Sequence, residues 1–180
     1  MCGLQGTGKS TIAGQLARQL PAPVLPVDPV EVALWAAGID RDQPTGLAAF
    51  VVVGALASTM LKLGQTVVVD AVNDAEMARE QWRDLAARHE VPLRFVEVVC
   101  SDPALHRQRL ESRRDNEVAG AAEPPWESVE ARRAGFEGWA DDRLVVDSVD
   151  PVPDNVRRVL AYVTGYGGPT GTRRGGGPGT

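Results

Sequence analysis

The sequence predicts an α/β fold, a three-layer sandwich in which helices cover both faces of a parallel β-sheet. Short apolar runs rich in β-branched residues alternate with helical patterns, and several of these runs end at an aspartate. In addition, a glycine-rich turn leads into the first helix. With 180 residues, 43% of them apolar, the chain is long enough for one packed domain but hardly for two. We therefore expect one domain over residues 1–164.

Strands are expected where the short apolar runs occur. Residues 66–69 are apolar or β-branched throughout and lead into Asp70, which is typical of a parallel strand buried on both faces. Similar runs lead into Asp28 and Asp147. The expected strands cover residues 24–27, 66–69, 93–100 and 144–146.

Helices are expected where apolar residues recur every three or four positions. In the first helix Ile12, Ala13 and Leu16 follow this spacing, and Pro21 ends it. Asn73 and Glu76 have the spacing of a capping box, which is expected to begin the fourth helix. The expected helices cover residues 9–20, 30–37, 47–63, 73–89, 103–114, 127–138 and 153–163.

The composition argues against several classes of protein. The 19 basic and 24 acidic residues give a net charge of -5, so no general positive field would hold a nucleic acid. The longest apolar stretch, residues 47–61, is shorter than the ~20 residues of a membrane-spanning helix, and we expect it to be a buried helix. Two cysteines cannot form a disulfide framework, and no basic segment leads into an apolar signal core. These features favour a cytoplasmic protein without a membrane partner.

The end of the chain has a different composition. Glycine occupies eight of the 16 positions in residues 165–180. Such a segment cannot bury enough apolar surface to offset its loss of conformational entropy. We expect residues 165–180 to form a disordered tail.

Residues 3–10 read G-x-x-x-x-G-K-S, the pattern of a P-loop. Glycines let the backbone wrap a phosphate chain with its N–H groups inward, and the following helix adds the positive end of its dipole. Lys9 is expected to reach the β- and γ-phosphates of ATP, and Ser10 to bind Mg²⁺. A plain glycine-rich turn is the alternative, disfavoured because a chain with so few lysines rarely matches this pattern by chance. The expected nucleotide-binding residues here are Gly3, Leu4, Gln5, Gly6, Thr7, Gly8, Lys9, Ser10 and Thr11.

The first strand of this kind of fold is short of residues. A P-loop follows a strand, yet only Met1 and Cys2 precede Gly3. In the expected strand order, 2-3-1-4-5, the first strand lies between two neighbours, so its truncation would leave backbone groups unpaired inside the domain. We expect an upstream start with about five more apolar residues. The alternative is a truncated protein of low stability.

Several segments together resemble the AAA-type P-loop kinases, the group that includes gluconate kinase, polynucleotide kinase, chloramphenicol phosphotransferase and zeta toxin. The resemblance spans residues 3–163. It implies a five-stranded parallel sheet and transfer of the ATP γ-phosphate to a hydroxyl group. The segments that carry it are the P-loop, Asp28, Val67-Val68-Val69-Asp70, Arg109-Leu110-Glu111-Ser112-Arg113 and Leu144-Val145-Val146-Asp147.

The resemblance implies roles for two aspartates. Asp28, after the second strand, takes the place of the base that orients the acceptor hydroxyl. Its alternative role is to cap the helix that begins at Pro29. Asp70 ends a strand where such proteins place the acidic residue that holds Mg²⁺ through water, or it contacts the acceptor; the alternative is a structural cap on the next loop.

The resemblance also implies that an arginine near the lid, residues 115–125, clamps the phosphates. Arg113 is the first candidate for this catalytic role and Arg109 the second, since residues four apart share a helix face. The alternative is a solvated helix face paired with Glu111 and Asp115. By the same resemblance, residues 148–153 lie where relatives pack the adenine.

The expected activity is therefore ATP- and Mg²⁺-dependent transfer of phosphate to a small hydroxylated molecule, with Lys9, Asp28 and Arg113 as catalytic residues. Polynucleotide kinases carry an arginine soon after the aspartate, whereas Val30, Glu31 and Val32 follow here, which disfavours a nucleic-acid acceptor. The alternative is a module that binds or hydrolyses ATP without an acceptor. The sequence specifies neither the acceptor nor the oligomeric state.

Overall fold

The computed structural model describes residues 1–115 and 124–165, with the backbone alone at residues 113–115. The expected tail therefore lies outside the described residues from residue 166 on. The elements in chain order are α1 (Lys9–Gln19), β1 (Val24–Pro26), α2 (Val27–Ala36), α3 (Thr45–Lys62), β2 (Val68–Asp70), α4 (Glu76–Arg88), β3 (Phe95–Val99), α5 (Pro103–Asp115), α6 (Trp126–Ala131), the 3-10 helix η1 (Arg132–Phe136), β4 (Arg143–Asp147) and α7 (Val152–Thr164).

The first residues of the chain join two pairs of parallel strands. β1 pairs with β2 and β3 pairs with β4, in both cases in parallel. Between the pairs, the Cys2 N–H donates to the Val96 carbonyl over 2.7 Å, and the Gly3 N–H donates to the Val72 carbonyl over 3.1 Å. With residues 1–3 counted as the first strand, the order is the predicted 2-3-1-4-5. This strand amounts to a single parallel bridge between Cys2 and Glu97.

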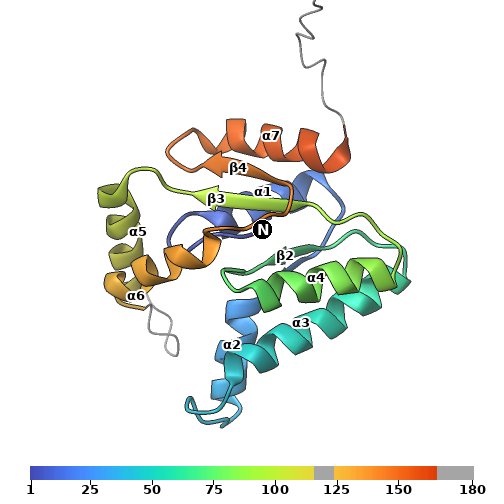
Figure 1. Ribbon diagram of the computed structural model, residues 1–180, viewed down its shortest axis with the longest axis horizontal. Helices are drawn as coiled ribbons and strands as arrows, with labels where there is room; N and C mark the ends of the chain where they lie inside the picture. Colours follow the sequence, from blue (N-terminus) through green and yellow to red (C-terminus); the bar gives the residue numbers. More distant parts are fainter. Residues whose placement is uncertain (116–123, 166–180) are drawn as a thin grey trace, which may run out of the picture.

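Helices cover both faces of this sheet, as the sequence predicts. In Figure 1, α7 lies at the top and α3 and α4 lie at the lower right, with the strands between them. On the face covered by α1 and α7, Ile12 and Val159 pack against Val96 and Val98. The other face uses the neighbouring residue Phe95, because side chains alternate between the faces of a strand. The three-layer sandwich is confirmed.

Below Met1, a cavity of about 650 Å³ separates the two strand pairs. Its walls include Val67 beside β2 and Phe95 at the start of β3, so it lies where the first strand would continue upstream. Leu16 of α1 and Trp82 of α4 close the cavity from the two helical layers. Most of the residues that line this space are apolar.

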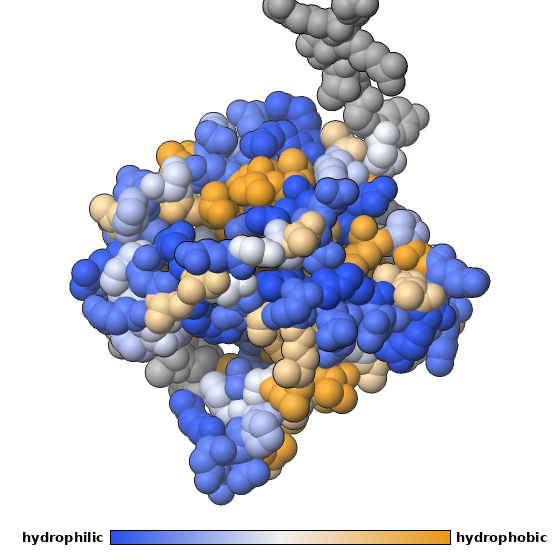
Figure 2. Space-filling view, viewed as in Figure 1, coloured by the Kyte–Doolittle hydropathy of each residue, from blue (hydrophilic) through white to orange (hydrophobic). Residues whose placement is uncertain are grey.

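Helix α3 is buried along one face only. Ala49, Val53 and Ala57 pack into the core, whereas Val51 is 60% exposed and Leu47 and Leu56 are also exposed. Figure 2 shows apolar side chains at the surface in the lower part of the molecule, where α3 lies in Figure 1. By length and composition alone this helix could cross a membrane, although it packs here against α2 and α4. The expectation of a wholly buried helix is therefore wrong.

Two predicted helix starts are also wrong. Helix α2 begins at Val27, directly after β1, so Asp28 lies in its first turn rather than in a loop. Helix α4 begins at Glu76 with Ala75 as its N-cap, and Asn73 instead has a left-handed backbone with a φ of 59°. The capping box does not form because the Asn73 side chain is buried and bonds to Trp82 and to the first residues of the chain.

Candidate nucleotide site

The turn before α1 has a backbone that only glycine adopts readily. Gly3, Gly6 and Gly8 have φ values of 136°, 81° and 90°. At Gly3 a Cβ would lie 2.3 Å from the Val98 carbonyl oxygen, so the sheet itself excludes a side chain there. Thr7 closes the turn by donating its hydroxyl to the Leu4 carbonyl over 2.9 Å. The glycines predicted from the motif thus take the positions that the turn requires.

The turn opens onto a hollow of about 750 Å³ at the start of α1. Lys9 lines it and is only 3% exposed, and no salt bridge or side-chain hydrogen bond joins its ammonium to another described residue. Because this ammonium is accessible from the hollow rather than sealed inside the protein, an anion that enters the hollow can pair with it. The predicted residues that line this hollow are Gly6, Gly8, Lys9, Ser10, Thr11 and Arg109.

Arg109 reaches the same hollow from α5. Its guanidinium donates to the Ser148 hydroxyl over 2.7 Å and to the Ser148 carbonyl over 3.1 Å. Ser148 follows β4, so this pair brings α5 and the loop before α7 together at one wall. Arg107, in contrast, pairs with Glu111 on the surface, which matches the alternative of a solvated face at that residue. The side chain of Arg113 lies beyond those that are described.

Asp147, at the end of β4, helps to fix this wall. Burial alone would raise the pKa of Asp147, but hydrogen bonds from the Ser101 and Val149 amides lower the pKa below its usual value. Asp147 therefore remains a carboxylate that ties the loop after β3 to the loop after β4. Asn155 of α7, which sequence reasoning missed, donates to the Asp147 carbonyl over 2.6 Å and also lines the hollow.

The two predicted aspartates follow neighbouring strands but have different surroundings. Asp70 is 4% exposed, and one of its carboxylate oxygens is buried without a hydrogen-bond partner in residues 1–115 and 124–165. Asp28 is exposed in the first turn of α2 and does not cap that helix, because the N-cap is Pro26 and no side-chain hydrogen bond caps it. Neither aspartate takes the capping role that was its alternative.

These features fit a nucleotide with its metal ion. The loop has a glycine, Gly3, where a side chain would collide with the sheet, a lysine that lines an open hollow, and an unpartnered carboxylate oxygen on an adjacent strand end. Hydroxyl and carboxylate oxygens are ligands that Mg²⁺ prefers, and it often keeps several waters. Ser10 and Asp70 are the residues that would hold such an ion.

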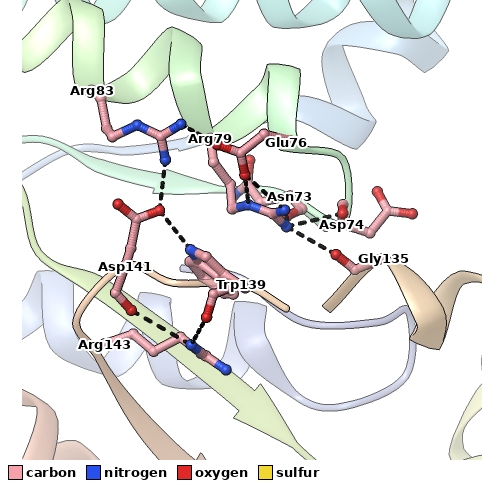
Figure 3. Close-up of polar contacts among 9 residues, drawn as sticks. All are labelled: Asn73, Asp74, Glu76, Arg79, Arg83, Gly135, Trp139, Asp141 and Arg143. Carbon is pink, nitrogen blue, oxygen red and sulfur yellow. Dashed lines mark hydrogen bonds and ion pairs between the residues drawn. The ribbon is translucent and has the colours of Figure 1, made fainter. Parts of the chain in front are cut away.

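The loop after β2 is fixed by an arginine that the sequence did not single out. Figure 3 shows the Arg79 guanidinium, which is 4% exposed, pointing at the carbonyls of Asn73, Asp74 and Gly135. The three donor–acceptor distances are 3.0, 2.9 and 3.1 Å. Nearby, Trp139 donates its indole N–H to Asp141 over 2.6 Å. Arg79 thereby ties the loop that follows Asp70 to η1, more than 50 residues later in the chain.

Arg132 adds a second link between the same two segments. It forms a two-pronged ion pair with Asp74, with distances of 2.7 and 3.0 Å. This hydrogen-bonded pair, together with the charges of Asp28 and Glu31, raises the pKa of Arg132. The arginine is therefore within electrostatic reach of Asp28, although the two are far apart in sequence. Nothing in the local pattern around Arg132 indicated this.

The solved structures that share this fold include a gluconokinase, an APS kinase and Kti12. Chaetomium thermophilum Kti12 in complex with ADP-AlF3 has a TM-score of 0.68 at 18% identity, covering 91% of this chain and 95% of that one. A gluconokinase from Sinorhizobium meliloti has a TM-score of 0.66 at 18% identity, covering 92% and 90%. The Mycobacterium tuberculosis APS kinase CysC, in complex with AMPPNP and APS, has a TM-score of 0.65 at 17% identity, covering 91% and 94%.

At these identities the likeness establishes the fold and leaves the substrate open. No curated protein sequence matches the chain. The sequence profile of one family does match, over residues 1–138, which include the P-loop, both candidate aspartates and Arg109. The chain therefore belongs to this family, the AAA domain family, and has the fold of the P-loop kinases.

Proposed function

We propose that the protein is an ATP- and magnesium-dependent phosphotransferase that moves the γ-phosphate of ATP to a hydroxyl group of a small molecule. The observation that carries the proposal is the hollow in which Lys9 and Arg109 meet from different elements. Two cationic side chains, Lys9 and Arg109, that line one hollow suit the binding of a chain of phosphates. The similar structures named as a gluconokinase and an APS kinase support a small acceptor.

Each residue has a distinct part in this proposal. The backbone N–H groups of the P-loop and the Lys9 ammonium hold the β- and γ-phosphates, and Arg109, with Arg113 after it in α5, neutralises charge that develops during transfer. Ser10 and Asp70 would hold Mg²⁺, which when bound supplies further positive charge to the phosphates. Asp28 accepts a hydrogen bond from the acceptor hydroxyl and holds its oxygen in line with the γ-phosphate.

Calorimetry with Mg²⁺ and ATP tests the nucleotide site. Lys9→Ala removes the ammonium from the hollow and is expected to weaken binding by about a hundredfold. Lys62→Ala is the matched control, because Lys62 is the other lysine of the chain and lies exposed at the end of α3. A folded wild-type protein that binds no nucleotide, or a Lys9→Ala variant that binds as tightly as wild type, would refute the site.

A screen of hydroxylated compounds by ADP release tests the transfer step. A true acceptor is expected to raise the ADP yield. Asp28→Ala is expected to reduce that rise by about a hundredfold, while the affinity for ATP stays within about twofold of the wild-type value. The competing function is a module that hydrolyses ATP without an acceptor. It is favoured if no hydroxylated compound raises turnover and Asp28→Ala leaves hydrolysis intact.

A further inference from the structure

A histidine that the proposed mechanism does not use contacts the backbone of the P-loop. His106 of α5 is 1% exposed, and its Nε2 lies 2.7 Å from the Gln5 carbonyl oxygen. Because a carbonyl oxygen only accepts hydrogen bonds, Nε2 must carry the proton. The neutral ring then has its lone pair on Nδ1.

This bond fixes one peptide group of the P-loop. In a trans peptide the carbonyl and the following N–H point in opposite directions, so a Gln5 carbonyl held by His106 turns the Gly6 N–H away from the ring. Gly6 lines the nucleotide hollow, and its N–H has no backbone acceptor among the residues that the structure describes. An N–H without a protein acceptor, in a residue that lines the hollow, is available to a phosphate oxygen.

The ring is held tightly in this place. A Cβ on Gly6 would lie 3.2 Å from Cδ2 of His106, so the imidazole packs directly on the P-loop backbone. The ring also meets Trp126 of α6 edge-to-face, with centroids 5.0 Å apart. Contacts with both Gly6 and Trp126 leave the imidazole little freedom to take another orientation.

The surroundings of His106 oppose a second proton. Nδ1 is buried and has no hydrogen-bond partner within the described part of the chain, so an added N–H would have nothing to bond to. Burial lowers the pKa of His106, which the bond to Gln5 partly opposes. The charged groups that face it are Arg133 of η1 and Arg109 of its own helix, which lower the pKa further, and Glu130 of α6, which raises it.

We propose that His106 is a positioning residue that turns the Gln5–Gly6 peptide toward the phosphates and does so only as the neutral ring, so that nucleotide binding weakens in acid. This rests on the proposed nucleotide site. The direction of the pH dependence follows from linkage. The imidazole binds a second proton more readily when it is released from its contact with the P-loop, so a lower pH favours states in which that contact is broken. The effect begins as the pH falls through about 6.5, the ordinary range of a histidine.

Two substitutions separate positioning from simple packing. His106→Gln keeps an N–H that can donate to the Gln5 carbonyl but does not titrate, whereas His106→Leu keeps bulk and loses the donor. The matched control is His89→Gln, because His89 is the other histidine of the chain and bonds to Ser58 away from the P-loop. His89→Gln also leaves one histidine ring for NMR.

The experiment measures the Kd of ATP with Mg²⁺ by calorimetry from about pH 8 to about pH 5.5, on protein shown to be folded at each pH. At the upper pH, His106→Leu is expected to bind about tenfold more weakly than wild type and His106→Gln within about threefold. Toward acid, wild type and His89→Gln are expected to lose about tenfold more affinity than His106→Gln. Titration of ATP itself is common to all variants and cancels in this comparison.

NMR of the His89→Gln protein gives an independent readout. The ring of His106 is expected to show the neutral form with the proton on Nε2 at neutral pH. Equal pH profiles for wild type and His106→Gln, unchanged affinity in His106→Leu, or a proton on Nδ1 would each overturn the proposal. Failure of the nucleotide site itself is distinguishable, because the wild-type protein would then bind no ATP at any pH.

Discussion

At the scale of single residues, the candidate site depends on backbone conformations that other residue types do not readily adopt. Gly3 and Gly6 are constrained twice, by a positive φ and by a neighbour within 3.2 Å of where a Cβ would stand. Gly14, in the interior of α1, is constrained by neither. In the sequence all three positions are simply glycine, and only their surroundings in the structure separate them.

Gly6→Ala and Gly14→Ala should therefore have opposite effects. Gly6→Ala is expected to lower the free energy of unfolding by about 1–3 kcal/mol and to weaken ATP binding, because its φ of 81° and His106 both oppose a Cβ. Gly14→Ala is expected to raise the free energy of unfolding by about 0.5–1 kcal/mol, as in an ordinary helix interior. Urea denaturation with calorimetry measures both. A Gly6→Ala variant with the stability and ATP affinity of the wild type would contradict the packing of His106 against the P-loop.

At the scale of elements, the loop after β2 owes its place to contacts with distant helices. Arg79 of α4 donates to three carbonyls, two in that loop and one in η1, and Arg132 of η1 pairs with Asp74. The loop begins directly after Asp70, so these contacts also hold the strand end that carries a candidate magnesium ligand. A loop whose backbone groups are not paired within a sheet or helix needs hydrogen bonds from side chains such as these.

Arg79→Met tests this tie. It leaves one buried and two partly buried carbonyls without their donor, and we expect the free energy of unfolding to fall by about 3 kcal/mol. Arg88→Met, an exposed arginine in the last turn of the same helix, is expected to change it by less than about 0.5 kcal/mol. Chemical denaturation followed by circular dichroism gives both values. Equal, small effects would mean that the loop is held by other contacts.

At the scale of the whole molecule, the sheet is joined in the middle by very few residues. Met1 and Cys2 bridge the two strand pairs, with the terminal amine donating to the Val69 carbonyl over 2.6 Å. Upstream of this bridge lies the apolar cavity of about 650 Å³. A strand placed there would find backbone partners on both sides and apolar side chains above and below.

We expect five β-branched apolar residues added ahead of Met1 to raise the free energy of unfolding by about 2–5 kcal/mol relative to the 180-residue chain. The gain is modest because the free energy of burying each side chain only slightly exceeds the conformational entropy lost on ordering it. Five glycine and serine residues added at the same place are the control and should have little effect. Thermal unfolding of the three proteins makes the comparison. Equal stability of all three would mean that the cavity does not accept a strand.

Sequence and structure agree best where a signal is local. The strand order agrees with the one expected for a P-loop fold, and the glycines of the motif sit at positions of positive φ. Asn73 shows where local reasoning fails: its spacing to Glu76 predicts a cap, but Trp82 and the first residues of the chain offer its side chain buried partners. A buried amide that gains such bonds outweighs a surface cap.

The sequence by itself determined the class of fold, the phosphate-binding turn and the residues on each strand end, because periodicity and glycine chemistry act within a few positions. The tertiary structure alone decided which side chains serve that turn. His106 meets Gln5 across 101 positions, and Arg109 meets Ser148 across 39. Such pairs depend on how helices pack on the sheet, and no short segment of the chain carries that information.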